Sequence, residues 1–192
     1  MGAKRRLTRK GVGGNDVMVR FWDLVTLYPR ISDRELEERL SVFIMEGDEE
    51  ELLGMARELL EFASPLMLED EGLRGLMASL EGKKLGLIIE GDYYSLVTFR
   101  RGGFEVELGS DETAPALIAA DRGVYRDAVL KRGDPMRLFL ERKIRVCGLP
   151  RMIRWVLPYI KVLRSRALYE KYLSRQAEIE ARLEDALTRI GY

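Results

Sequence analysis

Few side chains in this sequence could carry out covalent or acid–base chemistry. The chain of 192 residues has one cysteine, Cys147, and no histidine, which excludes Ser-His and Cys-His catalysis and most zinc sites. Cys147 falls on a predicted interior strand, where a small core residue is expected rather than a nucleophile. The acidic residues Asp111 and Glu112 could transfer protons, but they follow a strand as ordinary turn residues do. The sequence therefore predicts a protein that is not an enzyme and that uses no cofactor and no metal ion.

A basic segment is the second chemical feature. Between Arg142 and Arg166 there are eight basic residues and no acidic one, interleaved with aromatic and aliphatic side chains. Basic side chains attract anionic headgroups, while Trp and Tyr favour the membrane interface, so the pattern predicts a helix that docks transiently on an anionic membrane surface. The predicted membrane-docking residues are Arg151, Arg154, Lys161 and Arg164. In the alternative interpretation the apolar stripe of this helix faces the core, and its arginines pair with acidic helices between Asp33 and Glu51.

Composition limits the remaining classes of function. The chain has 32 basic and 32 acidic residues, so its formal net charge is zero and no overall field attracts nucleic acid. The apolar fraction of 46% suits one compact domain with extensions. No apolar run reaches about 18 residues, and no signal peptide is recognisable. We expect a cytoplasmic protein in a reducing compartment, without nucleic acid as a partner.

The N-terminal part is predicted to be helical after a short tail. Residues 1–15 combine basic side chains with glycines and should form a disordered basic tail. The pattern over residues 16–82 predicts an N-terminal region of four helices. Three start signals are a capping box at Ser32 and Glu35, an N-cap at Asp48, and an N-cap with first-turn proline at Ser64 and Pro65.

Short strands joined by glycine turns follow the helical region. The strands cover residues 85–90, 93–100 and 104–108, and the dipeptides Gly91-Asp92 and Gly102-Gly103 between them are typical of two-residue hairpin turns. Tight turns would pair Leu87 with Leu96 and Ile89 with Tyr94 on one face of the sheet. The other face would carry Val97, Phe99, Val106 and Leu108. Glutamates in the third strand predict that helices cover one face fully and the other only in part.

Two further strands and several helices complete the predicted pattern. The strands are residues 115–120 and 143–147, and the helices are residues 125–131, 136–141, a helix from Pro150 through Trp155, and a long charged helix over 159–190. The dipeptide Asp134-Pro135 predicts the start of the second of these helices. The long helix has an apolar side formed by Ile179, Leu183, Leu187 and Ile190, and Pro158 is expected to kink or divide it.

Three segments carry a resemblance to a known family. They are the two-hairpin sheet LGLIIEGDYYSLVTFRRGGFEVEL, the helix pair YRDAVLKRGDPMRLFLER and the strand-glycine ending KIRVCG. In the order and length of these parts, the run from Lys84 to Leu163 resembles the sterol-carrier-protein lipid-binding family. The resemblance implies an α+β fold with a small five-stranded, mainly antiparallel sheet packed by helices, here with extra N-terminal helices and a long C-terminal helix. The lipid-binding domain would span residues 83–163, and the C-terminal helix residues 164–192.

In that family the sheet and helices surround an apolar tunnel, so the resemblance implies non-covalent binding of a lipid in a hydrophobic cavity and its transfer between membranes. The lipid-binding residues on this reading are Val97, Phe99, Phe104, Val106, Met136, Phe139, Leu140, Ile144, Val146 and Trp155. The residues alone leave the cavity open, because the Leu, Phe and Met that line ligand pockets also fill ordinary cores. The alternative function is a scaffold or regulatory module whose long C-terminal helix pairs with another chain, as in a homodimer.

Overall fold

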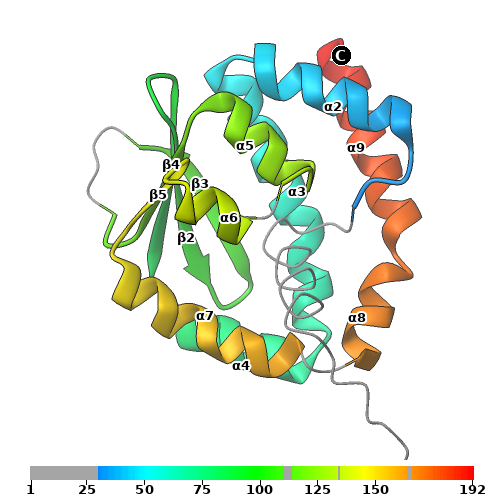
Figure 1. Ribbon diagram of the computed structural model, residues 1–192. Helices are drawn as coiled ribbons and strands as arrows, with labels where there is room; N and C mark the ends of the chain where they lie inside the picture. The colour runs from blue at the N-terminus through cyan, green and yellow to red at the C-terminus, as the bar shows by residue number, and fades with distance from the viewer. Residues whose placement is uncertain (1–29, 110–113, 134, 164–165) are drawn as a thin grey trace, which may run out of the picture.

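The computed structural model describes residues 30–109, 114–133, 135–163 and 166–192, which form an α+β fold (Figure 1). A five-stranded sheet has the strand order β3-β2-β1-β4-β5. In Figure 1 the sheet lies at the left, and the labelled helices lie to its right or beneath it. The predicted fold class is confirmed: a small sheet packed by helices, with further helices before it and a helix at the C-terminus.

Several predicted features lie outside the described residues. These are the basic tail 1–15, the first N-terminal helix, the turn at Asp111 and Glu112, the helix cap at Asp134, and the docking residue Arg164. Met136 and Lys161 lie on described helices, but their side chains do not belong to the described part of the structure.

Three of the expected N-terminal helices are described: α2 (Arg34–Glu46), α3 (Glu49–Leu68) and α4 (Glu71–Leu80). Asp48 begins α3 with a capping box, as its carboxylate accepts from the Glu51 N–H at 2.9 Å and its own N–H donates to Glu51 at 3.0 Å. The predicted capping box at Ser32 and Glu35 is wrong. Asp33 takes the N-cap position instead, and its carboxylate accepts from the Glu35 N–H at 2.8 Å.

The helix start predicted at Ser64 and Pro65 is also wrong, because α3 continues through both residues. The Ser64 hydroxyl donates to the Leu60 carbonyl at 2.6 Å, within the helix, which is the other way a serine satisfies its hydroxyl in helical backbone. The next helix starts at Asp70, whose carboxylate accepts from the Leu73 N–H at 3.0 Å.

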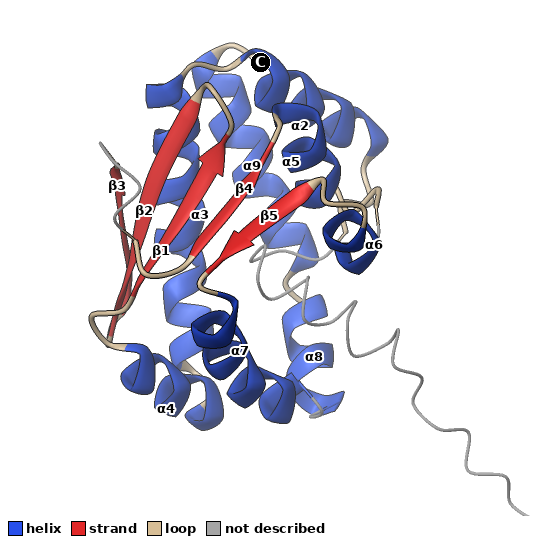
Figure 2. Cartoon of the chain, turned by 60° about the vertical axis from the view of Figure 1, so that its left-hand side comes forward, coloured by secondary structure: helices blue, strands red, loops and turns tan. Residues whose placement is uncertain are grey.

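The sheet consists of β1 (Lys84–Ile89), β2 (Tyr93–Arg100), β3 (Gly103–Leu108), β4 (Leu117–Ala120) and β5 (Ile144–Cys147), shown in Figure 2. Three neighbouring pairs are antiparallel, and β1 with β4 is parallel. The sheet is therefore mixed and mainly antiparallel, as the resemblance implied.

The first hairpin has a different register from the predicted one. Ile89 pairs with Tyr93, so the loop between them has three residues rather than two, and Leu87 pairs with Ser95 instead of Leu96. A register shift of one residue moves side chains to the opposite face. Leu87 and Ile89 therefore share a face with Val97, which corrects the prediction that they lie opposite it. We call this face, which packs against helices, the inner face, and the other the outer face.

The second hairpin keeps the predicted faces. Val97 pairs with Val106 and Phe99 with Phe104, so the predicted apolar set of these two strands lies together on the inner face. Glu105 and Glu107 alternate with this set and are exposed on the outer face, as expected for a strand with one solvated side.

The remaining helices are α5 (Arg122–Val129), α6 (Pro135–Leu140), α7 (Leu149–Leu163), α8 (Arg166–Leu173) and α9 (Gln176–Ile190). Pro158 lies inside α7, and the long helix expected over residues 159–190 is divided, with a turn between α8 and α9. The apolar side of α9 packs against α2 and α3, where Ile179, Leu183 and Leu187 are at most 2% exposed. The C-terminal helix is thus part of the core of its own chain.

Cys147 corrects another prediction. It lies at the end of β5, which is an edge strand, and its side chain is exposed. The predicted interior position is wrong because β5 pairs with β4 only.

Candidate functional site

The strand residues predicted to bind lipid all lie on the inner face. Paired residues point to the same side of a sheet. The register links Leu87 to Ile118 and Ile118 to Val146, and it pairs Ala120 with Ile144. The inner face therefore runs without interruption from β3 to β5 and includes Val97, Phe99, Phe104, Val106, Ile144 and Val146.

Helices of the same chain fill the β1–β3 half of this face. Val97 and Val106 belong to a core cluster with residues of α2, α3 and α9. Phe99 belongs to a second cluster with α4, and its ring meets that of Phe104 edge to face with centroids 5.5 Å apart. These four residues are core positions, because the helices that pack on them leave them buried or half-buried.

The β4–β5 half of the inner face is different. Ile118 and Val146 point to this side and are only half-buried, while Ile144 is 8% exposed. Among the described residues, neither core cluster includes a side chain of β4 or β5. We call Ile118, Ile144 and Val146 the candidate surface.

Two helices border the candidate surface. Figure 2 shows β5 at one edge of the sheet, with α6 beside its upper end and α7 below its lower end. On α6, Phe139 is half-buried. On α7, Trp155 is half-buried and packs against the α4 cluster. Leu140, also predicted to contact lipid, is 73% exposed.

Gly148 sets the direction in which α7 leaves the sheet. Its φ of 69° is in the left-handed region, and a Cβ at this position would lie 2.2 Å from the Pro115 carbonyl oxygen. Both features require glycine. The Gly148 carbonyl then accepts from the Met152 N–H at 3.0 Å, in the first turn of α7.

The charged residues near this edge are mostly cations. Arg151 and Arg154 are exposed, and Arg151 donates to the Pro115 carbonyl at 3.2 Å. Hydrogen bonds from Arg137 and Lys143 lower the pKa of the exposed Glu141 carboxyl, which keeps it ionised beside them. Among the described helices, none has the length and apolarity of a membrane span.

The predicted docking residues were all basic and did not include three exposed apolar residues of α7. Leu149, Ile153 and Leu157 are 40%, 49% and 55% exposed. Their spacing of four residues, which places them on one side of a helix, was the available signal. Apolar residues at helical spacing usually face a core, so the pattern did not separate the exposed side of α7 from its packed side.

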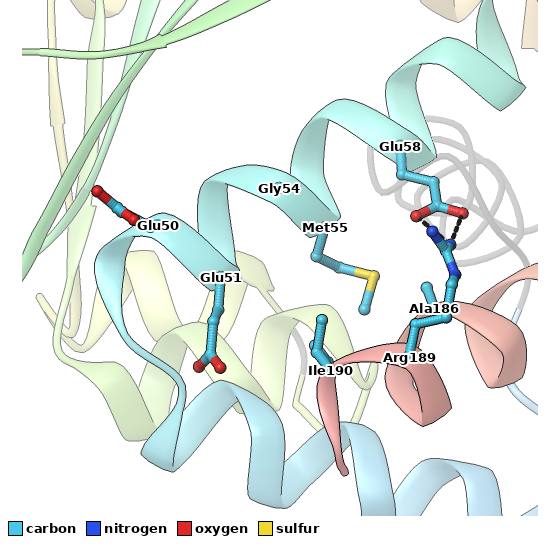
Figure 3. Close-up of a pocket in the computed structure, with 8 residues that line it drawn as sticks. All are labelled: Glu50, Glu51, Gly54, Met55, Glu58, Ala186, Arg189 and Ile190. Atoms are coloured by element: carbon cyan, nitrogen blue, oxygen red, sulfur yellow. Dashed lines mark hydrogen bonds and ion pairs between the residues drawn. The ribbon is translucent and has the colours of Figure 1, made fainter.

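A groove of about 360 Å³ lies elsewhere, between α3 and α9 (Figure 3). Met55, Ala186 and Ile190 form its apolar part. Glu50, Glu51 and Glu58 also line it, and Glu58 forms an ion pair with Arg189. Glutamates at the rim repel an anionic lipid headgroup, so this groove is a poor match for the predicted ligand.

Comparison with known proteins finds likenesses among solved structures. No protein-family model and no curated protein matches the sequence. Among solved structures, the chain is similar to one described as "UbiJ-SCP2 Ubiquinone synthesis protein", with a TM-score of 0.41 and 16% sequence identity. The likeness covers 58% of this chain and 88% of that one. At these values it does not decide what this chain binds.

Proposed function

We propose that this chain binds a lipid non-covalently, with the apolar part of the lipid against the candidate surface and between α6 and α7. The carrying observation is that Ile118 and Val146 continue the apolar inner face beyond the two core clusters and stay half-buried. A face that its own chain packs only in part can gain free energy by burying an apolar ligand.

The affinity would come from removal of apolar area from water. Burial contributes about 0.8 kcal/mol for each methylene group, and part of this is offset by the ordering of the ligand. Phe139 and the part of the Trp155 ring that α4 leaves open would supply aromatic area at the two ends of β5, since α6 ends before this strand and α7 begins after it. The proposal includes no reaction, because the chain has no histidine to activate a nucleophile.

Adjacent residues of α6 provide a matched test. Phe139→Asp places a carboxylate at the half-buried position, and Leu140→Asp places it at a position that is 73% exposed. A fluorescent fatty acid such as cis-parinaric acid is titrated into each purified protein. Wild type and Leu140→Asp should bind equally, whereas Phe139→Asp should bind at least about tenfold more weakly, a loss of about 1.4 kcal/mol.

Circular dichroism and native mass spectrometry complete this experiment. The circular dichroism spectrum of Phe139→Asp must match that of wild type, so that a loss of binding is not a loss of fold. Native mass spectra should show the wild-type chain with one lipid. A wild-type chain that takes up neither fatty acid nor sterol, or equal binding by both variants, would refute the proposed site.

A further inference from the structure

Helix α7 presents an apolar stripe to solvent. Leu149, Ile153 and Leu157 are four residues apart and 40%, 49% and 55% exposed. Successive residues of an α-helix are about 100° apart around its axis, so these three fall within one narrow sector. We call them the α7 stripe.

The opposite side of α7 is already packed. Trp155 lies on that side and contacts the cluster formed by Leu73, Leu76, Met77 and Leu80 of α4. Figure 1 shows α7 and α4 together beneath the sheet. The helix is therefore held to its own chain through one side, while the α7 stripe stays on the other.

The charges of the segment that contains the stripe have one sign. The segment from Arg142 to Arg166 has eight basic residues and no acidic one. Arg154 is exposed and lies beside the stripe, about 60° around the helix axis from Leu157. Arg151 is also exposed, but it lies about 40° from Trp155 on the other side of α7 and donates to the Pro115 carbonyl at 3.2 Å. An apolar stripe beside cations is the pattern of a helix that lies in the interface of an anionic bilayer.

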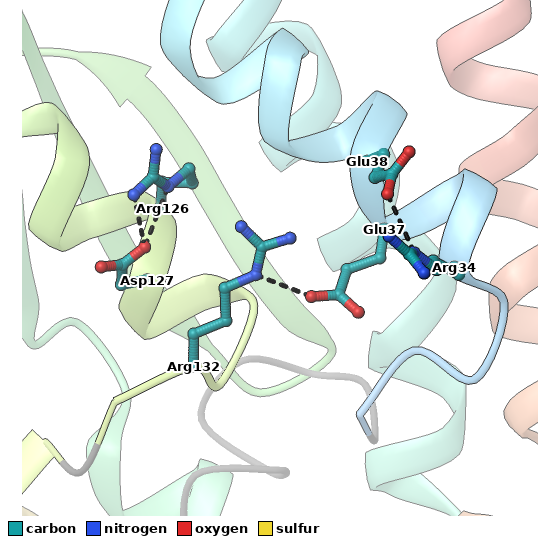
Figure 4. Close-up of polar contacts among 6 residues, drawn as sticks. All are labelled: Arg34, Glu37, Glu38, Arg126, Asp127 and Arg132. Carbon is teal, nitrogen blue, oxygen red and sulfur yellow. Dashed lines mark hydrogen bonds and ion pairs between the residues drawn. The ribbon is translucent and has the colours of Figure 1, made fainter.

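Acidic helices of the chain have cationic partners outside this segment. On α2, Glu38 pairs with Arg34 and Glu37 with Arg132, at 3.0 and 2.7 Å (Figure 4). On α3, Glu58 pairs with Arg189 (Figure 3). These carboxylates thus have arginines other than those of α7. Within the described part of the chain, no carboxylate pairs with Arg154, which is therefore available there for an external anion.

We propose that α7 docks this protein on an anionic phospholipid bilayer, with the α7 stripe inserted at the boundary of the acyl chains and Arg154 at the headgroups. Docking would bring the candidate surface, which α7 borders, next to the bilayer, so the role of docking in lipid loading rests on the proposed function. Docking itself is measured independently of lipid uptake.

The test compares two exposed apolar residues. Ile153→Asp changes the α7 stripe, and Val42→Asp changes a residue of α2 that is similarly exposed, 46% against 49%. Sedimentation with phosphatidylcholine vesicles, with and without phosphatidylglycerol, measures binding. Wild type and Val42→Asp should bind the anionic vesicles and release them at high salt. Ile153→Asp should bind at least about tenfold more weakly, and Arg154→Glu should also weaken binding.

Several results would overturn the proposal. These are a wild-type chain that does not sediment with anionic vesicles, or an Ile153→Asp variant that binds like Val42→Asp. Sedimentation velocity tests whether a second copy of the chain covers the stripe instead. If the wild-type protein is a dimer that does not bind vesicles, and Ile153→Asp converts it to a monomer, the stripe is a subunit interface. Uptake of cis-parinaric acid without vesicles is measured in parallel, and its absence would count against the proposed function and not against docking.

Discussion

At the scale of single residues, Gly148 offers the sharpest prediction. Gly148→Ala should lower the free energy of unfolding by roughly 2 kcal/mol or more, since a side chain in left-handed backbone costs 1–2 kcal/mol before any clash. The added Cβ would also meet the Pro115 carbonyl oxygen at 2.2 Å. Chemical denaturation followed by circular dichroism measures the change.

Gly54 is the matched control for this substitution. It lies inside α3, and a Cβ there would have no heavy atom within 4 Å. Gly54→Ala should stabilise the protein by about 0.5–1 kcal/mol, because alanine loses less backbone freedom in a helix. Equal effects of the two substitutions would show that the backbone at Gly148 is not the cause.

Single residues also show what the sequence could predict locally. Asp48 was predictable as a cap, because its capping box involves only residues three apart. Ser32 and Asp33 are both good caps, and the choice of Asp33 accompanies a distant contact: the Ser32 N–H donates to Glu180 of α9 at 2.6 Å. Local rules could not choose between two such neighbours.

At the scale of elements, the docking of α9 is open to a direct test. Leu183 is fully buried against α2 and α3, so Leu183→Ala should lower the free energy of unfolding by about 2–5 kcal/mol. Thermal or chemical denaturation measures this loss, and it should not depend on protein concentration.

A dependence of stability on protein concentration would favour the alternative function. In that case α9 would pair with another chain, as a homodimer or scaffold requires. In the structure α9 is instead tied to its own chain, since Arg39 of α2 donates to the Tyr192 carbonyl oxygen at 2.8 Å. The ring of Tyr192 also meets that of Phe43 edge to face at 5.1 Å.

The helices and strands themselves were largely predictable, but the lengths of their loops and the residues at which helices end were not. Alternating apolar residues identified the strands, but the first hairpin has a loop one residue longer than the Gly91-Asp92 pattern predicts. That single residue moved Leu87 to the inner face. The long helix expected over residues 159–190 is divided, although its charged sequence has no glycine or proline at the turn between α8 and α9.

At the scale of the whole molecule, stability should be constant near neutral pH and should fall only at alkaline pH. The chain has no histidine, so the free energy of unfolding should stay level between about pH 6 and 8. Burial raises the pKa of Tyr125, and burial also raises the pKa of Tyr93. Both stay protonated in the folded state when unfolded tyrosines ionise near pH 10.

The sign follows from these raised values. The folded state binds protons more tightly, so stability is complete below about pH 10 and is lost as the pH rises from there through the folded pKa values. Tyr125→Phe removes one of the two groups and should make this loss less steep. Unfolding measured by denaturant from about pH 6 to 11 checks it, and an identical slope in wild type and variant would contradict the assignment to Tyr125.

The sequence was sufficient to predict which residues of β2 and β3 share the inner face, but not which part of that face stays half-buried. Alternation put Val97, Phe99 and Val106 on one side, which the register confirms. The register then joins Ile144 and Val146 of the last strand to the same face, a link that the sequence alone did not predict. Which part of that face stays half-buried depends on α3 and α4, whose packing against β1–β3 is a tertiary contact. No local pattern reports such a contact, and the same holds for the exposed stripe of α7.

The exposed position of Cys147 allows a spectroscopic label to be attached to the native chain. It is the one thiol in the sequence and accessible to reagents, so a nitroxide or fluorophore attaches at a single known point without any engineering. Its side chain belongs to the outer face, because Cys147 pairs with Leu117 and Leu117 with Gly86. A label there leaves the candidate surface unobstructed and sits one residue before Gly148, where depth-dependent quenchers can report how close α7 lies to a membrane.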